Sequence, residues 1–469
     1  MFEVSAKPKN VTRAVIVGVH WKTGGSGDTE ATANSLLDEL AELCGTLGLE
    51  IADRVLARVG KPQARYVVGS GKAEEIMTRA RLAGADVIVF DNTLSPGQQR
   101  NWEALALDAD IAAGKAKKGD VPPVAVIDRE EVILDIFAQR AQTKEARLQV
   151  ALARMEYSLP RLTRAWGHLS RQMGGGLGGK GEGESQLETD RRLVRKRIDH
   201  IKEELAAVRS QRATQRKARQ RAPVPQAAIV GYTNAGKSSL LRALTGADVF
   251  IENKLFATLD PTTRQIELPD GGQKLLLTDT VGFVRKLPHR IVEAFKATLE
   301  ESVLADFLIH VLDATEPQIF AFHKTTLDVL AELGAHEKPT LTVFNKIDLL
   351  GAAGSEARET ALNGLRRHFP DALFVSTQTR EGLAELQHAM ADLLRDRIAR
   401  VELRLPPERG DLLADLHRQG HVIATAYEDD GAIHVHATLP PKFLPPFEQF
   451  RVPPTPKLEK KSAAVPAKI

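Results

Sequence analysis

The sequence has almost no cysteine, no long apolar run and little net charge, and each shortage excludes a class of protein. Cys44 is the only cysteine among 469 residues, so no disulfide can form within the chain. No stretch approaches the ~20 apolar residues of a membrane span, and the N-terminus carries no apolar segment suited to a signal peptide. We therefore expect a cytoplasmic protein that is not attached to a membrane. The net charge is only +3, so any affinity for nucleic acid must come from local patches.

What the sequence does contain is a glycine-rich loop between a predicted strand and a predicted helix. Apolar residues 227–230 lead into it, and residues 239–244 have a helical pattern. The loop consists of Gly231, Tyr232, Thr233, Asn234, Ala235, Gly236, Lys237 and Ser238. Such a loop lets backbone N–H groups converge on phosphate oxygens, with the lysine on the terminal phosphates and the serine hydroxyl on Mg²⁺. The helix N-terminus adds a partial positive charge.

Three further motifs follow in the order that a guanine-nucleotide switch requires. The first, at the end of an apolar strand, is Asp279, Thr280, Val281 and Gly282. We expect Asp279 to hold Mg²⁺ through water and the Gly282 N–H to meet the terminal phosphate. The second is Asn345, Lys346, Ile347 and Asp348, whose carboxylate can accept two hydrogen bonds from guanine but none from adenine. The third is the pair Ser376 and Thr377, whose backbone is expected at the guanine oxygen.

A switch segment with a Mg²⁺-binding threonine must lie between the phosphate loop and Asp279. The candidate residues are Phe256, Ala257, Thr258, Leu259 and Asp260. Thr258 is chosen because its Phe-x-Thr-Leu pattern resembles the switch of translation-associated GTPases, with Thr262 and Thr263 as alternatives. The expected metal ligands are then Ser238, Thr258 and Asp279, and the expected catalytic residues are Lys237, Thr258 and Gly282.

Phe283 follows Gly282 at the position where Ras-like hydrolases carry a glutamine that orients the attacking water. Phenylalanine cannot hydrogen-bond water. Slow intrinsic hydrolysis, completed by a group from a partner, is therefore expected.

The N-terminal part, residues 1–140, alternates predicted strands and helices, which favours a small, mostly parallel α/β domain. The expected strands include residues 13–19, 51–59, 66–68, 86–90 and 124–127, and helices are expected at 29–47, 73–82, from 96 and at 129–140. Within it, Gly69-Ser-Gly-Lys72 is half of a phosphate loop. A tight turn is favoured there over a weak phosphate site.

The middle part, residues 141–222, contains two helical seams around a glycine-rich run from Gly174 to Gly183. Leucines and a methionine at 148, 152, 155 and 159, and apolar residues at 194, 198, 201, 205 and 208, predict an antiparallel coiled coil. The flanking residues are Arg161, Arg164, Trp166, His168, Arg171, Arg191 and Arg192. Cations mixed with an aromatic ring suit RNA, and the basic run from Arg191 to Arg221 favours phosphate contacts over a merely solvated helix face.

Residues 223–398 form the predicted nucleotide domain, and residues 399–469 a small α+β domain whose end, from Pro453, is rich in Pro, Lys and Ala and is expected to be disordered. An Asp-Gly turn near Gly431 predicts a hairpin. His434 and His436 share one face of its second strand. A metal site is possible there, but paired surface histidines are favoured.

These motifs resemble those of the HflX GTPases, within the Obg-HflX-like superfamily. The resemblance covers residues 231–238, 256–260, 279–283 and 345–348, and it extends to residues 91–101, 133–141, 157–162 and 183–192. It implies a cytoplasmic, monomeric GTPase that uses GTP, GDP and Mg²⁺ and binds the large (50S) ribosomal subunit and its rRNA. It also implies a role in splitting stalled ribosomes under stress or in subunit biogenesis.

Two features depart from the family pattern. Thr377 stands where alanine is usual, and residues 115–120 resemble an insertion. One alternative function also stays open: an RNA-binding or RNA-remodelling module whose GTPase only gates assembly. GTP hydrolysis in the presence of large subunits, small subunits or free RNA would separate the two.

Overall fold

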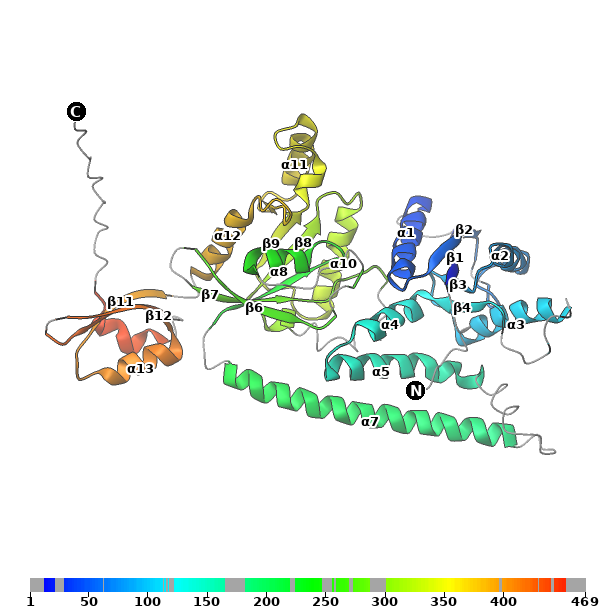
Figure 1. Ribbon diagram of the computed structural model, residues 1–469, viewed down its shortest axis with the longest axis horizontal. Helices are drawn as coiled ribbons and strands as arrows, with labels where there is room; N and C mark the ends of the chain where they lie inside the picture. The colour runs from blue at the N-terminus through cyan, green and yellow to red at the C-terminus, as the bar shows by residue number, and fades with distance from the viewer. Residues whose placement is uncertain are drawn as a thin grey trace, which may run out of the picture.

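The computed structural model describes residues 12–21, 29–61, 63–112, 114, 117, 122–164, 182–219, 224–246, 255–256, 259–269, 273–286, 301–395, 399–428, 430–439 and 443–452. Its described strands form three separate sheets that follow one another along the chain. Figure 1 shows the N-terminal unit on the right, the central unit beside it and the C-terminal unit on the left. The predicted α/β fold class is confirmed, whereas the domain boundaries at 140, 222 and 398 stay predictions.

The N-terminal unit is a four-stranded parallel sheet in the order β2-β1-β3-β4. Its strands are β1 (Arg13–Trp21), β2 (Glu50–Val59), β3 (Val87–Phe90) and β4 (Ala125–Asp128). Its helices are α1 (Glu30–Thr46), α2 (Ser70–Leu82), α3 (Pro96–Ala112) and α4 (Arg129–Arg140). Alternate residues of β1 enter cores on opposite faces, as a parallel sheet covered on both sides requires.

The strand predicted over residues 66–68 does not join this sheet. Tyr66 and Val68 bridge each other, and Val67 adopts a positive φ of 70°. Side chains of α3 donate hydrogen bonds to backbone carbonyl groups here. Trp102 Nε1 donates to the Tyr66 oxygen at 3.1 Å, and Asn101 Nδ2 donates to the Arg65 oxygen at 2.9 Å. The Val67 oxygen accepts from the Gln63 N–H at 3.1 Å, so this segment is a buried turn whose carbonyl groups bond to α3 or within the turn.

Two long helices form the middle of the chain. They are α5 (Lys144–Ser158), followed by the 3₁₀ turn η1 (Leu159–Arg164), and α7 (Glu182–Arg219). Figure 1 shows α5 and α7 packed side by side in opposite directions beneath the first two units, which confirms the antiparallel pair. Ile198, Ile201 and Leu205 of α7 are buried. Ion pairs join Lys202 to Glu156 at 2.9 Å and Lys144 to Glu204 at 3.8 Å.

The central unit is a six-stranded sheet in the order β10-β9-β8-β5-β7-β6, parallel except for the edge strand β6. Its strands are β5 (Gln226–Gly231), β6 (Thr262–Glu267), β7 (Lys274–Asp279), β8 (Phe307–Asp313), β9 (Thr340–Asn345) and β10 (Leu373–Phe374). Its helices are α8 (Lys237–Thr245), α10 (Ile319–Glu332), η2 (Ile347–Leu350), α11 (Glu356–His368) and α12 (Leu383–Arg395). The carboxyl ends of the parallel strands meet at one edge, where the phosphate loop follows β5, the Asp279 segment ends β7 and the Asn345 motif ends β9.

The C-terminal unit is an antiparallel sheet in the order β11-β13-β12. Its elements are β11 (Ala399–Leu405), α13 (Gly410–Gln419), β12 (His421–Tyr427), β13 (Ile433–Leu439) and the 3₁₀ turn η4 (Pro445–Phe450). The predicted hairpin is confirmed, because the Glu428 N–H donates to the Ala432 oxygen and the Gly431 N–H to the Glu428 oxygen. The tail from Pro453 lies outside the described residues. None of the helices that the structure describes is both long and apolar enough to cross a membrane.

Candidate functional site

The loop between β5 and α8 has the geometry of a phosphate cradle. Two of its glycines are required by close contacts as well as by positive φ angles. A Cβ on Gly231 (φ 146°) would lie 2.2 Å from the Val311 oxygen, and one on Gly236 (φ 95°) would lie 2.1 Å from Asn345 Nδ2. Only glycine fits both positions, so the backbone can curve closely around a ligand.

Lys237 and Ser238 open helix α8 at the base of this cradle. The buried Lys237 Nζ donates to the Tyr232 carbonyl oxygen at 2.8 Å. Burial lowers the pKa of the Lys237 ammonium to about 8, although the nearby Asp279 carboxylate opposes that shift. The Ser238 hydroxyl donates to Asp279 Oδ2 at 2.5 Å. A hydroxyl beside a carboxylate is the all-oxygen donor pair that Mg²⁺ prefers, so these two residues fit that ion.

The segment after Asp279 lies directly against the phosphate loop. The Thr233 N–H donates to the Phe283 oxygen at 2.8 Å, and the Phe283 N–H to the Gly231 oxygen at 3.1 Å. A Cβ on Gly282 would come within 2.8 Å of both Lys237 Nζ and Thr233 Cα. The Phe283 ring is buried and belongs to the hydrophobic core, so this side chain cannot orient a water molecule.

The Asn345–Asp348 motif and the Ser376–Thr377 pair meet at the carboxyl ends of β9 and β10. Asn345 Nδ2 donates to the Ala235 oxygen at 3.1 Å, which links this motif to the phosphate loop. Ser376 Oγ donates to Asp348 Oδ1 at 2.6 Å and so orients the carboxylate predicted to recognise guanine. The Thr377 backbone N–H donates to Asn345 Oδ1 at 3.2 Å, a bond that does not depend on the Thr377 side chain. Lys346 has a positive φ of 65° and pairs with Asp313 at 2.7 Å.

The predicted switch threonine, Thr258, and its neighbour Ala257 lie outside the described residues. Phe256 is buried and packs edge-on against Phe137 of α4, with ring centroids 4.6 Å apart. Leu259 is also buried. Asp260 accepts hydrogen bonds from the Gln142 and Thr143 N–H groups at 2.9 and 3.2 Å, just before α5.

The side chains of Thr263 and Thr280 have hydrogen-bond partners within the protein. Thr263 Oγ1 lies 2.9 Å from Thr278 Oγ1, and Thr280 Oγ1 donates to the Ile229 oxygen at 2.7 Å. Val281 is buried near the phosphate loop. Any contact of Thr280 or Val281 with nucleotide must therefore come from the backbone, and their assignment stays a prediction.

Sequence reasoning missed the contacts that join the phosphate loop to the N-terminal unit. The Tyr232 hydroxyl donates to Glu39 of α1 and accepts from the Arg285 N–H at 2.6 Å. The same glutamate pairs with Arg285 Nε at 2.9 Å and with Arg129 at 3.0 Å. Glu39 thus joins the phosphate loop and the segment after Gly282 to another domain.

A second acid repeats this arrangement. Asp91, just after β3, pairs with Arg129 at 2.5 Å and with Lys286 at 2.6 Å. Arg129 is almost fully buried, and Glu39 and Asp91 raise the pKa of its guanidinium against the opposing effect of burial. We call Glu39, Asp91, Arg129, Tyr232, Arg285 and Lys286 the interdomain network. No motif predicts it, because its members lie far apart in the sequence.

Helix α1 also lines a cleft at the phosphate loop. The cleft has a volume of about 460 Å³, and its walls include Asp38 and Glu42 of α1, Asn234 of the loop, and Asp313. Burial raises the pKa of the Glu42 carboxyl, and so do the neighbouring acids. Glu39 and Arg285 of the interdomain network line the same cleft, so the N-terminal unit contributes one of its walls.

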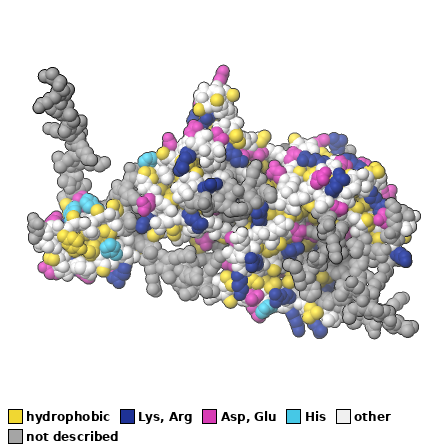
Figure 2. All heavy atoms as spheres, in the orientation of Figure 1, with side chains coloured by type: hydrophobic (Ala, Val, Ile, Leu, Met, Phe, Trp, Pro, Cys, Tyr) yellow, Lys and Arg dark blue, Asp and Glu magenta, His cyan; other side chains and the backbone are white. Residues whose placement is uncertain are grey.

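The regions predicted to contact RNA divide into two groups. Arg161 is partly buried: its guanidinium donates to the Leu94 oxygen at 2.7 Å and to Gln99 Oε1 at 3.0 Å, so its side chain is held within the protein, and its contact with RNA stays a prediction. By contrast, Arg192, Arg195 and Lys196 of α7 are exposed, and Figure 2 shows Lys and Arg side chains along this lower edge. Trp166, His168, Arg171 and most of the glycine-rich run lie outside the described residues, and nothing is described of the Arg164 side chain.

The half loop Gly69-Ser-Gly-Lys72 is the start of α2. Gly69 is its N-cap, and the Lys72 ammonium pairs with Glu75 at 2.6 Å. The favoured turn interpretation thus fits better than a phosphate site, although residues 70–72 are helical. Of the predicted insertion, residues 115–120, only Lys117 is described.

Comparisons with known proteins agree with these motifs. Three family profiles match successive parts of the chain: "GTP-binding GTPase N-terminal" over residues 34–138, "GTP-binding GTPase Middle Region" over 140–219 and "50S ribosome-binding GTPase" over 226–346. The solved complex of SsGBP with GDP aligns at 24% identity with a TM-score of 0.44, covering 81% of this chain and 98% of that chain. Because that likeness is weak, the family assignment rests on the sequences.

Relatives named GTPase HflX cover nearly the whole chain. The protein of Akkermansia muciniphila is 49% identical over 458 residues, 96% of this chain and 99% of that protein. The Escherichia coli K12 protein is 42% identical over 86% of this chain and 89% of its own length. The Chlamydia pneumoniae protein is 39% identical over 96% and 90%, respectively. With the phosphate loop, the Asp-x-x-Gly segment and the guanine motif assembled at one sheet edge, the chain belongs to the HflX family of GTPases and hydrolyses GTP.

Proposed function

We propose that this GTPase binds the large ribosomal subunit through its rRNA, as a cytoplasmic monomer, and that it acts in splitting stalled ribosomes or in subunit biogenesis. The observation that carries the proposal is the exposed basic face of α7. Arg192, Arg195 and Lys196 project from a long helix that runs beneath the first two units. Phosphate backbones attract such a face at low cost in desolvation. The description of the profile that matches residues 226–346, a 50S ribosome-binding GTPase, points the same way.

The nucleotide site supplies the switch. Ser238 and Asp279, with Thr258 as the predicted third residue, would hold Mg²⁺, whose charge neutralises the phosphates when it is bound. Lys237 Nζ, which bonds to the Tyr232 oxygen, would exchange that partner for phosphate oxygens. Asp348, oriented by Ser376, would select guanine. The buried Phe283 leaves the orientation of water to a partner.

The interdomain network gives the switch a direct route to the N-terminal unit. Gly282 lies three residues before Arg285. The Arg285 backbone N–H donates to the Tyr232 hydroxyl and to Glu39, and the Arg285 side chain also donates to Glu39. A change in how the Gly282 segment is held would therefore reach α1 without passing through the helical pair.

Co-sedimentation with separated ribosomal subunits tests the proposal. The protein is mixed with large or small subunits in a GTP analogue, in GDP and without nucleotide. We expect binding to large subunits in the GTP analogue and weaker binding in GDP. A triple variant Arg192→Glu, Arg195→Glu, Lys196→Glu should bind about tenfold or more weakly. The control is Arg366→Glu with Arg367→Glu, two exposed cations on α11, which should bind as the parent does.

A second function is favoured by the same basic face, namely an RNA-binding module whose GTPase only gates assembly. Stimulation of GTP hydrolysis separates the two. Acceleration by intact large subunits but not by free RNA supports the ribosomal function. Equal acceleration by free RNA, or binding that ignores the nucleotide, would replace it with the RNA-binding module.

A further inference from the structure

The C-terminal sheet brings together three metal-ligating side chains on the face that its helix leaves open. Glu402 of β11 lies directly opposite His436 of β13, and His434 is the next residue on the same face. The inward residues Leu403 and Val435 are fully buried in the core that α13 covers. Because side chains alternate along a strand, the acid and both imidazoles must project to the other side.

The distances among these side chains suit a metal ion better than hydrogen bonds. His434 Nε2 lies 3.3 Å and His436 Nε2 lies 3.4 Å from the same oxygen, Glu402 Oε1. Charge-assisted hydrogen bonds are usually about 2.7–2.9 Å long. In a tetrahedral zinc site with bonds of about 2.0–2.1 Å, neighbouring ligand atoms are separated by about 3.3 Å. All three ligand atoms lie within 4.8 Å of one another.

The surroundings leave room for an ion and do not repel it. The residues of β12 that pair with His436 and His434 are Ala424 and Ala426, whose side chains are small. The neighbouring cation on the same face, Arg404, pairs with Glu428 at 2.8 Å and with Asp430. Those two acids balance its charge beside the three ligands.

We propose that Glu402, His434 and His436 form a binding site for a divalent transition-metal ion, with Zn²⁺ as the best match. Two imidazoles exclude Mg²⁺ and Ca²⁺, which take oxygen ligands. Three protein ligands leave a fourth position, and the half-exposed His436 places that position toward solvent. This site is separate from the nucleotide site and does not depend on the ribosomal function. It also reverses the sequence-based preference for paired surface histidines, because the sequence could not show Glu402 between them.

Zinc titration of the full-length protein tests the site. The protein is stripped with a chelator and saturated with GDP and Mg²⁺, so that Ser238 and Asp279 are occupied. Zn²⁺ is then titrated against a chromophoric competitor. We expect one zinc equivalent in the parent protein, and an affinity at this site about 100-fold or more weaker in His434→Ala and in His436→Ala. Glu402→Gln should also weaken binding, because the carboxylate charge is lost.

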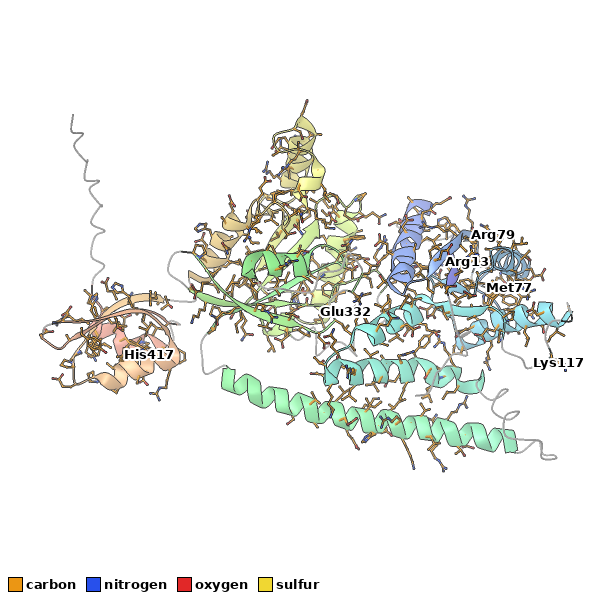
Figure 3. All side chains as sticks on the ribbon, in the orientation of Figure 1. Arg13, Met77, Arg79, Lys117, Glu332 and His417 are labelled. Carbon is orange, nitrogen blue, oxygen red and sulfur yellow. The ribbon has the colours of Figure 1, made fainter. Side chains whose placement is uncertain are left out.

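His417→Ala is the matched control, because His417 is an exposed histidine on α13, on the opposite side of the sheet (Figure 3). It should keep the zinc equivalent. Co²⁺ provides a second measurement: intense visible absorption in the parent protein and its loss in His434→Ala would indicate low-coordinate binding by these ligands. Circular dichroism checks that each variant is folded. Equal zinc stoichiometry and affinity in the parent and in folded His434→Ala and His436→Ala proteins would overturn the proposal, as would an absence of zinc binding in the parent.

Discussion

Two glycine-lysine turns begin helices in this protein, and they differ in what surrounds them. Lys72, at the start of α2, is partly exposed and pairs with Glu75 in its own helix. Lys237, at the start of α8, is buried against the Tyr232 carbonyl; the Gly282 segment lies beside its Nζ, and Asn345 bonds to the loop just before it. Both turns offer N–H groups at a helix N-terminus. The comparison teaches that enclosure by neighbouring strand ends, and not the turn alone, makes a phosphate site.

The largest expected effect separates the two lysines. Lys237→Ala should weaken GTP binding by about 1,000-fold, or about 4 kcal/mol, because a buried cation that meets the phosphates is lost. Lys72→Ala should leave the affinity unchanged. Titration with a fluorescent GTP analogue measures both. Similar losses in the two variants would mean that the first turn also binds phosphate.

The next largest effect concerns stability and the interdomain network that packs against the second turn. Glu39→Gln removes a buried charge that Arg129 and Arg285 share, and we expect a loss of about 3 kcal/mol in the free energy of unfolding of the N-terminal unit. Denaturant unfolding followed by tryptophan fluorescence measures it, because Trp102 is fully buried in that unit. The control is Glu50→Gln, an exposed acid 3.7 Å from Arg13, which should lose under 1 kcal/mol by the usual range for surface pairs. Equal losses would show that the network adds no more than a surface pair.

Replacing one glycine near each turn tests how closely the backbone is packed there. Gly282→Ala would force a Cβ to within 2.8 Å of Lys237 Nζ and Thr233 Cα, so the segment must shift. We expect GTP hydrolysis to slow by about 100-fold, or about 2.7 kcal/mol, because a donor to the terminal phosphate is displaced. Gly71→Ala meets open space and should change nothing. Single-turnover hydrolysis gives both rates, and an unchanged Gly282→Ala rate would remove Gly282 from the mechanism.

The smallest expected effect is a loss of stability at acid pH, caused by a buried histidine in the sheet that carries the second turn. The central sheet carries the fully buried His310 in β8, whereas residues 14–17 of β1 are apolar. Burial, together with His323 and Lys237, lowers the pKa of His310 to about 3. In the unfolded chain this histidine has a pKa near ~6.5 and is protonated at acid pH, whereas in the folded domain it stays neutral. Stability should therefore fall as the pH drops below about 6.5, by about 2 kcal/mol at pH 5.

Calorimetry at pH 7 and pH 5 checks this expectation, using the transition that GDP shifts upward. His310→Leu should remove about 2 kcal/mol of the acid-induced loss, which corresponds to roughly 4–8 °C in Tm for a domain of this size. His336→Gln, an exposed histidine in the same domain, serves as the control. The same acid sensitivity in His310→Leu would show that other groups cause it.

Much of the fold and the nucleotide site could be predicted because the signals are local. Apolar runs gave β1, β3, β5 and β7, and the loop from Gly231 to Ser238 has the spacing that its geometry demands. The segment at Tyr66 was mispredicted because its apolar residues were taken as a strand pattern, whereas Trp102 and Asn101 use its carbonyl groups. The partners of Arg161 could not be predicted, because a cation beside a glycine-rich run looks the same whether its side chain is free or bonded to Leu94 and Gln99.

The sequence by itself determined the chemistry of the nucleotide site, because each motif is a short run whose spacing fixes which atoms can meet a phosphate, a base or an ion. Only the tertiary structure decided which residues of the N-terminal unit contact that site. Tyr232 and Glu39 are 193 residues apart, and they meet because the packing of two domains leaves two acids, Glu39 and Asp91, and the cations that pair with them close together. Glu402 likewise reaches His434 and His436 only through strand register. Such meetings follow from the free energy of burying whole surfaces, and no local spacing encodes them.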